Sequence, residues 1–263
     1  MSIITKALLE NVERLAHEAG AAIMQVYRRE FDVELKADRS PLTEADKAAH
    51  VIIAHGLGVL APGVPILSEE DTERFNGPNA DGFYWLVDPL DGTKEFIKRN
   101  DEFTVNIALI AKGKPVLGVV VAPALKLTYL AAEGLGAFKA SADGQWQVIQ
   151  ASPPPLKGQS WRVLGSRSHA DPRTSQWLDA LGKHELQAMG SSLKSCLIAE
   201  GKADVYPRFG PTCLWDTGAA QAIVEQAGGR VATFENTPLS YSLPKHALPE
   251  HMLNPDFVVW GLA

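Results

Sequence analysis

The sequence predicts an α/β (α+β) protein with an N-terminal antiparallel-sheet half and a C-terminal α/β half. Two amphipathic stretches open the chain, and closely spaced apolar strands follow up to residue 140. After residue 158, strands alternate with helices. With 46% hydrophobic and 21% charged residues, the composition is ordinary for a globular protein, which excludes disordered and fibrous classes.

Two helices are predicted ahead of the first sheet. The first is predicted over residues 3–29, where apolar side chains recur at helical spacing: Ile4, Leu8, Val12, Leu15, Ala19, Ile23 and Val26. The second is expected to follow Ser40 and Pro41, with Thr43 as its N-cap and Asp46 completing a capping box, and to end near Gly58.

Short apolar runs bounded by turn residues predict the strands of the first sheet. The runs 103–111 and 116–123, joined by a Gly- and Pro-containing turn, predict a long hairpin. The run 83–88 is apolar on both faces, as expected for a strand between two layers. Further strands are expected at 64–67, 127–133 and 136–140.

The Pro-rich segment 152–158 is the best candidate for a linker, which divides the chain into subdomains 1–155 and 156–263 of one compact unit. The second subdomain begins a strand–helix alternation. Strands are expected at 161–165, 185–190, 203–208 and 230–234, and helices at 172–181, 191–201 and 215–229.

Charge and cysteine content bound the environment and the partners. The formal net charge is −6, which disfavours non-specific binding to nucleic acid. Cys196 and Cys213 form no zinc-type spacing, and a reducing compartment is the default expectation. Because the sequence has neither a signal core nor an apolar run of ~20 residues, we expect a cytoplasmic protein without a transmembrane segment. The sequence leaves the oligomeric state open.

The segment Asp88-Pro-Leu-Asp-Gly-Thr93 concentrates chemistry at the end of the apolar strand 83–88. We expect a turn that lets Asp88 and Asp91 point at one centre, where Mg²⁺ would separate the two charges and the Leu90 carbonyl could be a further ligand. Free backbone N–H groups at Gly92 and Thr93 would suit a phosphate. A plain surface turn is the alternative. An aspartyl-phosphate enzyme is disfavoured because its two acids are spaced differently.

Other acids could join this pair, although each has a simpler explanation. Glu69 and Glu70 follow the strand 64–67 and could be a solvated charge run. Asp216 and Asp46 could each be a helix cap. Their occurrence together with the 88–93 segment favours a shared metal centre.

This set of motifs resembles the lithium-sensitive, magnesium-dependent phosphatases of the inositol monophosphatase superfamily over essentially the whole chain. The matching segments are PLTEAD (41–46), SEED (68–71), DPLDGT (88–93) and WDTGAAQAIVEQAGG (215–229). The run 85–110, together with SRSHAD (166–171), GSSLK (190–194) and YPRFGPT (206–212), resembles the bacterial CysQ branch, the 3′(2′),5′-bisphosphate nucleotidases.

The resemblance implies a layered αβαβα sugar-phosphatase-like sandwich and a small phosphorylated nucleotide as substrate. The implied reaction is hydrolysis of adenosine 3′,5′-bisphosphate to AMP and phosphate in sulfur assimilation and nucleotide recycling, with 3′-phosphoadenylyl sulfate as a further substrate. The first subdomain would bind the metals and the second would give substrate selectivity. Some bacterial relatives associate with the inner membrane, but no basic amphipathic helix predicts this here.

The resemblance also implies a set of metal ligands for two to three Mg²⁺ ions. Glu69, Asp88 and the Leu90 carbonyl would hold one ion, and Asp88, Asp91 and Asp216 a second. A third, weaker ion would lie near Glu69, with Glu70 as an additional candidate. Asp46 and Thr93 would then help the metals to activate the attacking water, with Glu69 counted among the catalytic residues.

Substrate-binding residues are implied in both subdomains. The Gly92 and Thr93 N–H groups would hold the 3′-phosphate beside Asp216. The side chains that would bind the second phosphate and the purine are Lys194, Arg208, His169 and Ser191. The simpler alternatives are a solvated helix face for Lys194, an exposed loop for Arg208 and a turn for His169.

The chain departs from the family pattern at Gly218, where alanine is usual. Glycine inside a helix costs roughly 0.5–1 kcal/mol relative to alanine, so we expect a looser helix carrying Asp216 and a slightly lower metal affinity. Two alternative functions remain. An inositol monophosphatase or sugar bisphosphatase would share the chemistry, and a non-catalytic metal or nucleotide sensor would lack it.

Overall fold

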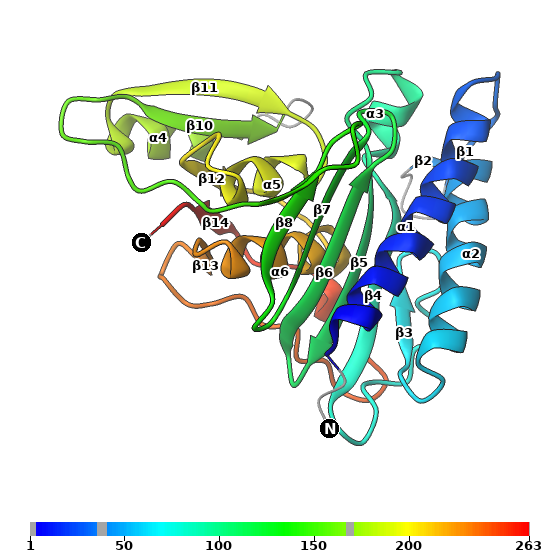
Figure 1. Cartoon of the computed structure of the whole chain (residues 1–263). Helices are drawn as coiled ribbons and strands as arrows, with labels where there is room; N and C mark the ends of the chain where they lie inside the picture. The colour runs from blue at the N-terminus through cyan, green and yellow to red at the C-terminus, as the bar shows by residue number, and fades with distance from the viewer. Residues whose placement is uncertain (1–3, 36–40, 167–170, 263) are drawn as a thin grey trace.

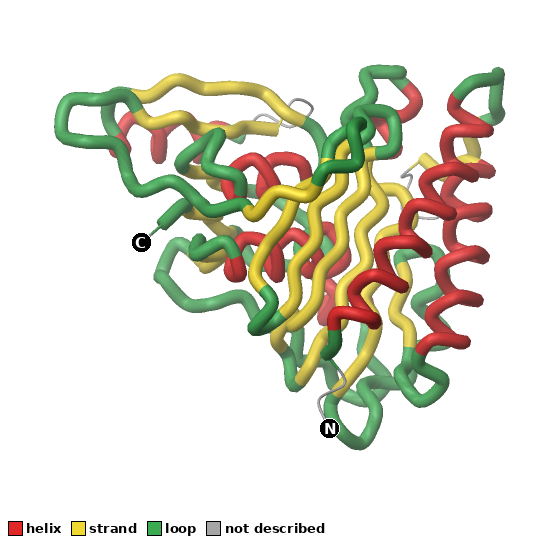
Figure 2. The backbone as a smooth tube through the Cα atoms, in the orientation of Figure 1, coloured by secondary structure: helices red, strands yellow, loops and turns green. Residues whose placement is uncertain are grey.

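The computed structural model describes residues 4–35, 41–166 and 171–262, and their helices and strands stack in five layers (Figure 1). Two helices cover one face of a seven-stranded sheet, two more separate that sheet from a five-stranded sheet, and one packs on the far face of the second sheet (Figure 2). This order confirms the αβαβα sandwich. From the first layer to the last, the helices are α1 (Lys6–Tyr27) with α2 (Glu44–Leu60), α5 (Leu193–Ala199) with α6 (Gly218–Gln226), and α4 (Pro172–Leu181).

The first two helices form as their apolar periodicity predicts. Helix α1 begins after Thr5, whose side chain accepts from the Leu8 N–H, and it buries one face against the sheet. Helix α2 has the predicted capping box of Thr43 and Asp46, and it ends at Leu60 rather than near Gly58. A short hairpin, β1 (Val33–Leu35) with β2 (Pro41–Thr43), joins them. No described helix is both long and apolar enough to cross a membrane.

The seven-stranded sheet follows the chain in strict order from β3 to β9. Only β3 and β4 run parallel; every other neighbouring pair is antiparallel. Both faces are covered over most of the sheet, which explains the continuous apolar runs. The strands are β3 (Ile66–Ser68), β4 (Phe83–Asp91), β5 (Thr104–Ala111), β6 (Lys114–Ala122), β7 (Leu127–Ala132), β8 (Gly136–Ala140) and the unpredicted β9 (Trp146–Val148).

The prediction of a turn at residues 88–91 is wrong. Strand β4 continues through Asp91, which pairs with Thr104, and the register shifts between Asp88 and Asp91. Pro89 lies inside this irregularity, where its missing N–H costs no ladder hydrogen bond. Gly92 then adopts a left-handed conformation, with φ of 91°, and helix α3 (Thr93–Ile97) begins. The irregular strand end therefore brings both acids to the same edge.

The five-stranded sheet contains both parallel and antiparallel pairs. Strand β10 pairs in parallel with β11 and β12, whereas β14 runs antiparallel between β12 and β13. Strand β14 was not among the strands predicted from the sequence. The order is β11-β10-β12-β14-β13, with β10 (Trp161–Ser166), β11 (His184–Met189), β12 (Val205–Arg208), β13 (Arg230–Thr233) and β14 (Phe257–Trp260).

The helix predicted over 215–229 divides into the 3₁₀ turn η1 (Leu214–Asp216) and helix α6. Gly218 is the first residue of α6, so the expectation of a glycine inside a loosened helix is wrong. A Cβ there would lie 2.8 Å from Leu86 Cδ2. The glycine therefore lets α6 start close against β4, next to the turn that carries Asp216.

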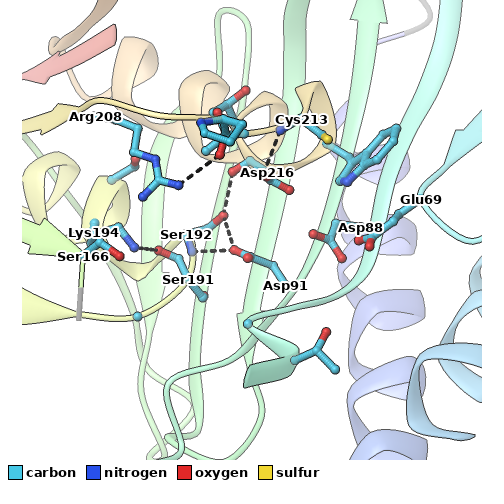
Figure 3. A pocket seen from close by; sticks show the side chains of 18 of the residues that line it. Glu69, Asp88, Asp91, Ser166, Ser191, Ser192, Lys194, Arg208, Cys213 and Asp216 are labelled. Carbon is cyan, nitrogen blue, oxygen red and sulfur yellow. Dashed lines mark hydrogen bonds between the residues drawn. The ribbon is translucent and has the colours of Figure 1, made fainter. Parts of the chain in front are cut away.

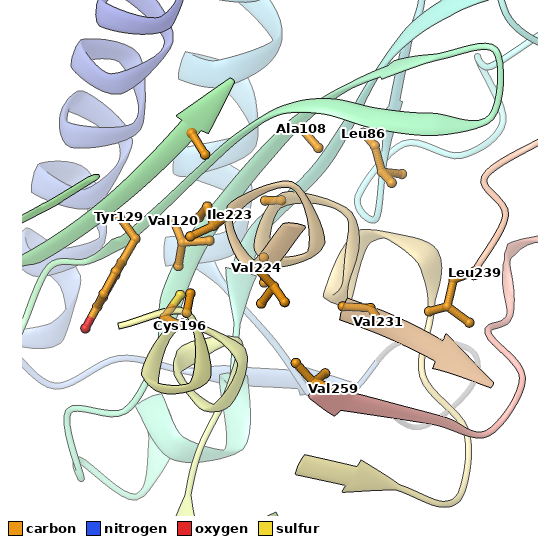
Figure 4. Packing of buried hydrophobic residues seen from close by; sticks show 14 of the residues in the cluster. Leu86, Ala108, Val120, Tyr129, Cys196, Ile223, Val224, Val231, Leu239 and Val259 are labelled. Atoms are coloured by element: carbon orange, nitrogen blue, oxygen red, sulfur yellow. The ribbon is translucent and has the colours of Figure 1, made fainter. Parts of the chain in front are cut away.

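One large hydrophobic core joins the two halves of the chain. Leu86 and Tyr129 from the first sheet pack with Ile223 of α6 and Val259 of the second sheet (Figure 4). The segment between β9 and β10 contains the predicted linker and carries no strand. The chain thus changes sheets near residue 155, while its two halves bury their apolar faces together.

Candidate active site

A cleft of about 650 Å³ opens where the two halves meet. Its floor comes from the end of β4, from α3 and from the 3₁₀ turn η1, and its opposite wall comes from the segment before α5 and the end of β12. Figure 3 shows Glu69 and Asp88 together on one side, with Lys194 and Arg208 across from them. Most of the residues expected to be functional therefore meet in one place.

Three carboxylates converge at the floor of this cleft. Asp88, Asp91 and Asp216 each offer an oxygen, and these oxygens lie within 4.8 Å of one another. Burial, together with the charges of Glu69, Asp91 and other nearby acids, raises the pKa of Asp88 well above its usual value. Burial and the neighbouring Asp91 raise the pKa of Asp216 to about 8. A bound cation would offset this repulsion, and an all-oxygen donor set suits a hard divalent ion.

Asp216 is not the N-cap of the last helix, because Thr217 holds that position, but it belongs to a capping box one turn earlier. One of its oxygens accepts the Cys213 N–H at 2.9 Å and closes the 3₁₀ turn, while the carboxylate also belongs to the cluster. Glu69 faces the same cleft, and its N–H donates to the Val87 carbonyl at 3.1 Å. Glu70 is absent from the described residues that line the cleft, so its place among the ligands stays a prediction.

Thr93 and Asp46 approach each other beside the carboxylates. Thr93 Oγ1 lies 3.4 Å from Asp46 Oδ1 and 3.3 Å from the Leu90 carbonyl oxygen. The other oxygen of Asp46 accepts from the N–H and the hydroxyl of Thr43, at 2.7 and 2.6 Å. Asp46 therefore caps α2 with one oxygen and turns the other toward Thr93.

The opposite end of the cleft is cationic and buried. The Lys194 ammonium donates to the Ser191 carbonyl at 2.7 Å and lies 5.2 Å from the centre of the Tyr206 ring. Burial lowers the pKa of Lys194 to about 8. Arg208 ends β12 and donates to the Pro211 carbonyl at 3.0 Å, while its buried Nε has no partner among the described residues. Neither side chain is on a solvated face or in an exposed loop.

Of the remaining residues expected to bind substrate, two lie in the cleft and one is outside the described part of the chain. Ser191 and Gly92 line the cleft, and the Ser191 hydroxyl lies 2.9 Å from Thr104 Oγ1. His169 lies outside the described residues.

Sequence reasoning missed Asn106, Ser192 and Glu95, which are buried at or beside the cluster. Asn106 was detectable as a polar residue inside an apolar strand, and Ser192 as the neighbour of Ser191. Glu95 did not stand out in the sequence because it lies in a stretch with several other charged residues.

The fold and the carboxylate cluster together define a class of protein. The family model described as the inositol monophosphatase family matches residues 6–254. The chain belongs to the inositol monophosphatase family, whose enzymes depend on metal ions. The resemblance that the motifs indicated is thus confirmed.

Relatives within the family are similar over nearly their full length. The 3′(2′),5′-bisphosphate nucleotidase CysQ of Escherichia coli (strain K12) is 51% identical over 255 residues, covering 96% of this chain and 99% of that protein. The same-named protein of Buchnera aphidicola is 44% identical and covers 91% of this chain and 89% of its own.

Solved structures agree. CysQ from Bacteroides thetaiotaomicron matches with a TM-score of 0.82 and 37% identity over 100% of both chains. An inositol monophosphatase from Anabaena, 24% identical with a TM-score of 0.73 over 98% of this chain and 91% of its own, shares the fold.

Proposed function

We propose that this protein is a Mg²⁺-dependent 3′(2′),5′-bisphosphate nucleotidase. It would hydrolyse the 3′-phosphate of adenosine 3′,5′-bisphosphate to give AMP and phosphate, and it would also act on 3′-phosphoadenylyl sulfate. The observation that carries this proposal is the pairing, in one cleft, of a carboxylate cluster with two buried cations. The relatives that bear the nucleotidase name support the substrate class.

The carboxylate end suits two to three Mg²⁺ ions. Their ligands would be Asp88, Asp91, Asp216, Glu69 and the Leu90 carbonyl, with Glu70 as a further candidate. Bound Mg²⁺ would polarise the phosphoryl oxygens and lower the pKa of an attacking water. Removing Mg²⁺ would remove this polarisation of the phosphate and the water, so activity should vanish in EDTA.

The chain itself would orient the reacting groups. Thr93 would accept a proton from the attacking water and donate its own to Asp46, whose Oδ1 lies 3.4 Å from the Thr93 hydroxyl oxygen. The Gly92 and Thr93 N–H groups would bind oxygens of the 3′-phosphate at the start of α3. A shift of the Thr93–Asp46 pair or of the two N–H groups would reduce the rate of hydrolysis more than the affinity for substrate.

The cationic end would provide selectivity. Lys194 and Arg208 line the cleft and would bind the second phosphate through charge-assisted hydrogen bonds. Ser191 and His169 complete the proposed nucleotide contacts. We also propose a cytoplasmic location, which is supported by a chain with only two cysteines, Cys196 and Cys213, neither of them in a disulfide among the described residues.

The Lys194→Ala variant tests the substrate assignment. We expect its kcat/KM for adenosine 3′,5′-bisphosphate to fall by roughly a hundredfold, because a charged hydrogen bond of about 2–3 kcal/mol is lost. Activity on inositol 1-phosphate, which has no second phosphate, should change far less. An equal loss on both substrates would contradict the nucleotide assignment and favour the inositol monophosphatase alternative.

A further inference from the structure

We propose that Ser192 and Asn106 are positioning residues that fix the orientation of Asp91 for metal binding. This inference rests on the proposed function, because it takes Asp91 to be a metal ligand. All hydrogen bonds that the described residues donate to Asp91 end on one oxygen, Oδ2. The other oxygen, Oδ1, is then left for a cation.

Asn106 is held in a single amide orientation by strand β5. Its Oδ1 accepts from Thr104 Oγ1 at 2.9 Å, and because a carboxylate that binds a cation can only accept, Nδ2 is the atom that faces Asp91. That nitrogen donates to Ser192 Oγ at 2.9 Å and lies 3.4 Å from Asp91 Oδ2. Since Asn106 is only 1% exposed, its amide acts on Asp91 and Ser192 rather than on a ligand.

Ser192 connects segments from both halves of the chain. Its N–H donates to Asp91 Oδ2 at 2.7 Å, and its hydroxyl lies 3.0 Å from that oxygen and 3.0 Å from the Asp216 carbonyl (Figure 3). The hydroxyl accepts from Asn106 and has one proton to share between these two acceptors. It is therefore committed to the protein, and Ser192 would influence substrate only through Asp91.

The loop that carries Ser192 is packed closely enough to hold this geometry. The Gly190 N–H donates to Glu102 Oε2 at 2.7 Å, and a Cβ on Gly190 would lie 2.9 Å from the Glu102 carbonyl oxygen. Ser191 has a positive φ of 50°, and its carbonyl accepts from the Lys194 ammonium. One short loop thus supports the metal end and the cationic end of the cleft together.

Ser192→Ala should weaken metal binding by removing the hydroxyl while keeping the backbone donor. Groups that orient metal ligands typically contribute 10–100-fold in affinity. We expect the Mg²⁺ concentration for half-maximal thermal stabilisation, measured on the full chain without substrate, to rise about tenfold. Asn106→Leu should shift it in the same direction, and the double variant should add little, because the two residues act on the same oxygen.

The control variant is Ser152→Ala, which removes a hydroxyl that donates to the Gly201 carbonyl at 2.8 Å outside the cleft. It should keep the Mg²⁺ midpoint of the unmodified protein. At saturating Mg²⁺, the KM of Ser192→Ala for the nucleotide should stay within about twofold.

Two results would overturn the inference. A purely structural role would lower the melting temperature of Ser192→Ala and Asn106→Leu equally at every Mg²⁺ concentration, with unchanged midpoints. A raised KM with an unchanged midpoint would instead place Ser192 in contact with substrate. If Mg²⁺ did not stabilise the unmodified protein against heat, both this inference and the proposed metal site would be wrong. If it responded and released phosphate while the variants kept its midpoint, only this inference would fail.

Discussion

Asp46 and Asp216 each make a capping-box hydrogen bond, and each also lies at or beside the carboxylate cluster. Asp46 accepts from Thr43 with one oxygen and lies beside Thr93 with the other. Asp216 accepts from Cys213 with Oδ2 while its carboxylate joins the cluster. The two interpretations that the sequence left open for these acids are therefore compatible, because a cap uses only one carboxylate oxygen.

The raised pKa of Asp216 predicts how the metal-free protein responds to pH. Its pKa is 3.8 in the unfolded reference and about 8 in the folded protein, so between these values the folded state retains a proton that the unfolded chain has lost. Stability in EDTA should therefore fall as the pH rises from about 4 to about 8. Thermal unfolding in EDTA at several pH values across this range measures the change in stability. The Asp216→Asn variant should show a weaker pH dependence.

Mg²⁺ should restore the lost stability, most strongly near the upper end of that range, because there it competes least with protons. A metal-free protein that became more stable from pH 5 to pH 8 would contradict the raised pKa.

For individual residues, the sequence indicated the acids of the cluster better than the groups that hydrogen-bond to them. Asp88 and Asp91 are close in the chain, and their spacing with Gly92 was enough to indicate a centre. Ser192 and Asn106 reach Asp91 from other elements, so their role depends on tertiary packing that no local spacing encodes.

The end of strand β4 positions the site at the scale of elements. Its register shift brings Asp88 and Asp91 to one edge, and the left-handed Gly92 turns the chain into α3. Sequence predicted the strand but gave a turn in place of the irregular strand end. A proline next to acids and a glycine is equally typical of both, so local signals could not separate them.

Gly92→Ala should test this arrangement. Gly92 has a φ of 91°, and an added Cβ would lie 3.1 Å from the Glu102 carbonyl oxygen. We expect a loss of about 2 kcal/mol in unfolding free energy, from backbone strain and crowding, and a clear drop in kcat.

Gly134→Ala provides the matched control, since its φ is 78° with nothing within 4 Å of the added Cβ. It should lose only about 1 kcal/mol and keep full activity. Equal activity losses in the two variants would contradict the positional role of Gly92.

The two halves behave as one body at the scale of the whole molecule. Besides the shared core, Glu200 at the end of α5 accepts from Tyr129 at 3.0 Å and pairs with Lys139 on the first sheet. The split of the predicted last helix and the antiparallel β14 escaped sequence analysis, because both depend on how the second sheet packs on α6.

Glu200→Leu should destabilise the protein by about 3 kcal/mol, because it leaves the largely buried Lys139 without its partner. Chemical denaturation would measure this loss. Glu10→Gln removes an exposed partner of Lys6 and should cost under about 1 kcal/mol. Similar small losses in both variants would show that the contacts of Glu200 with Tyr129 and Lys139 do not hold the two halves together.

The most direct test of the whole account is phosphate release by the unmodified protein from two substrates, with Mg²⁺ and with EDTA. We predict Mg²⁺-dependent turnover of adenosine 3′,5′-bisphosphate, little turnover of inositol 1-phosphate, and none of either in EDTA. Preferential turnover of inositol 1-phosphate would contradict the roles given to Lys194 and Arg208. Undiminished activity in EDTA would contradict the metal centre itself.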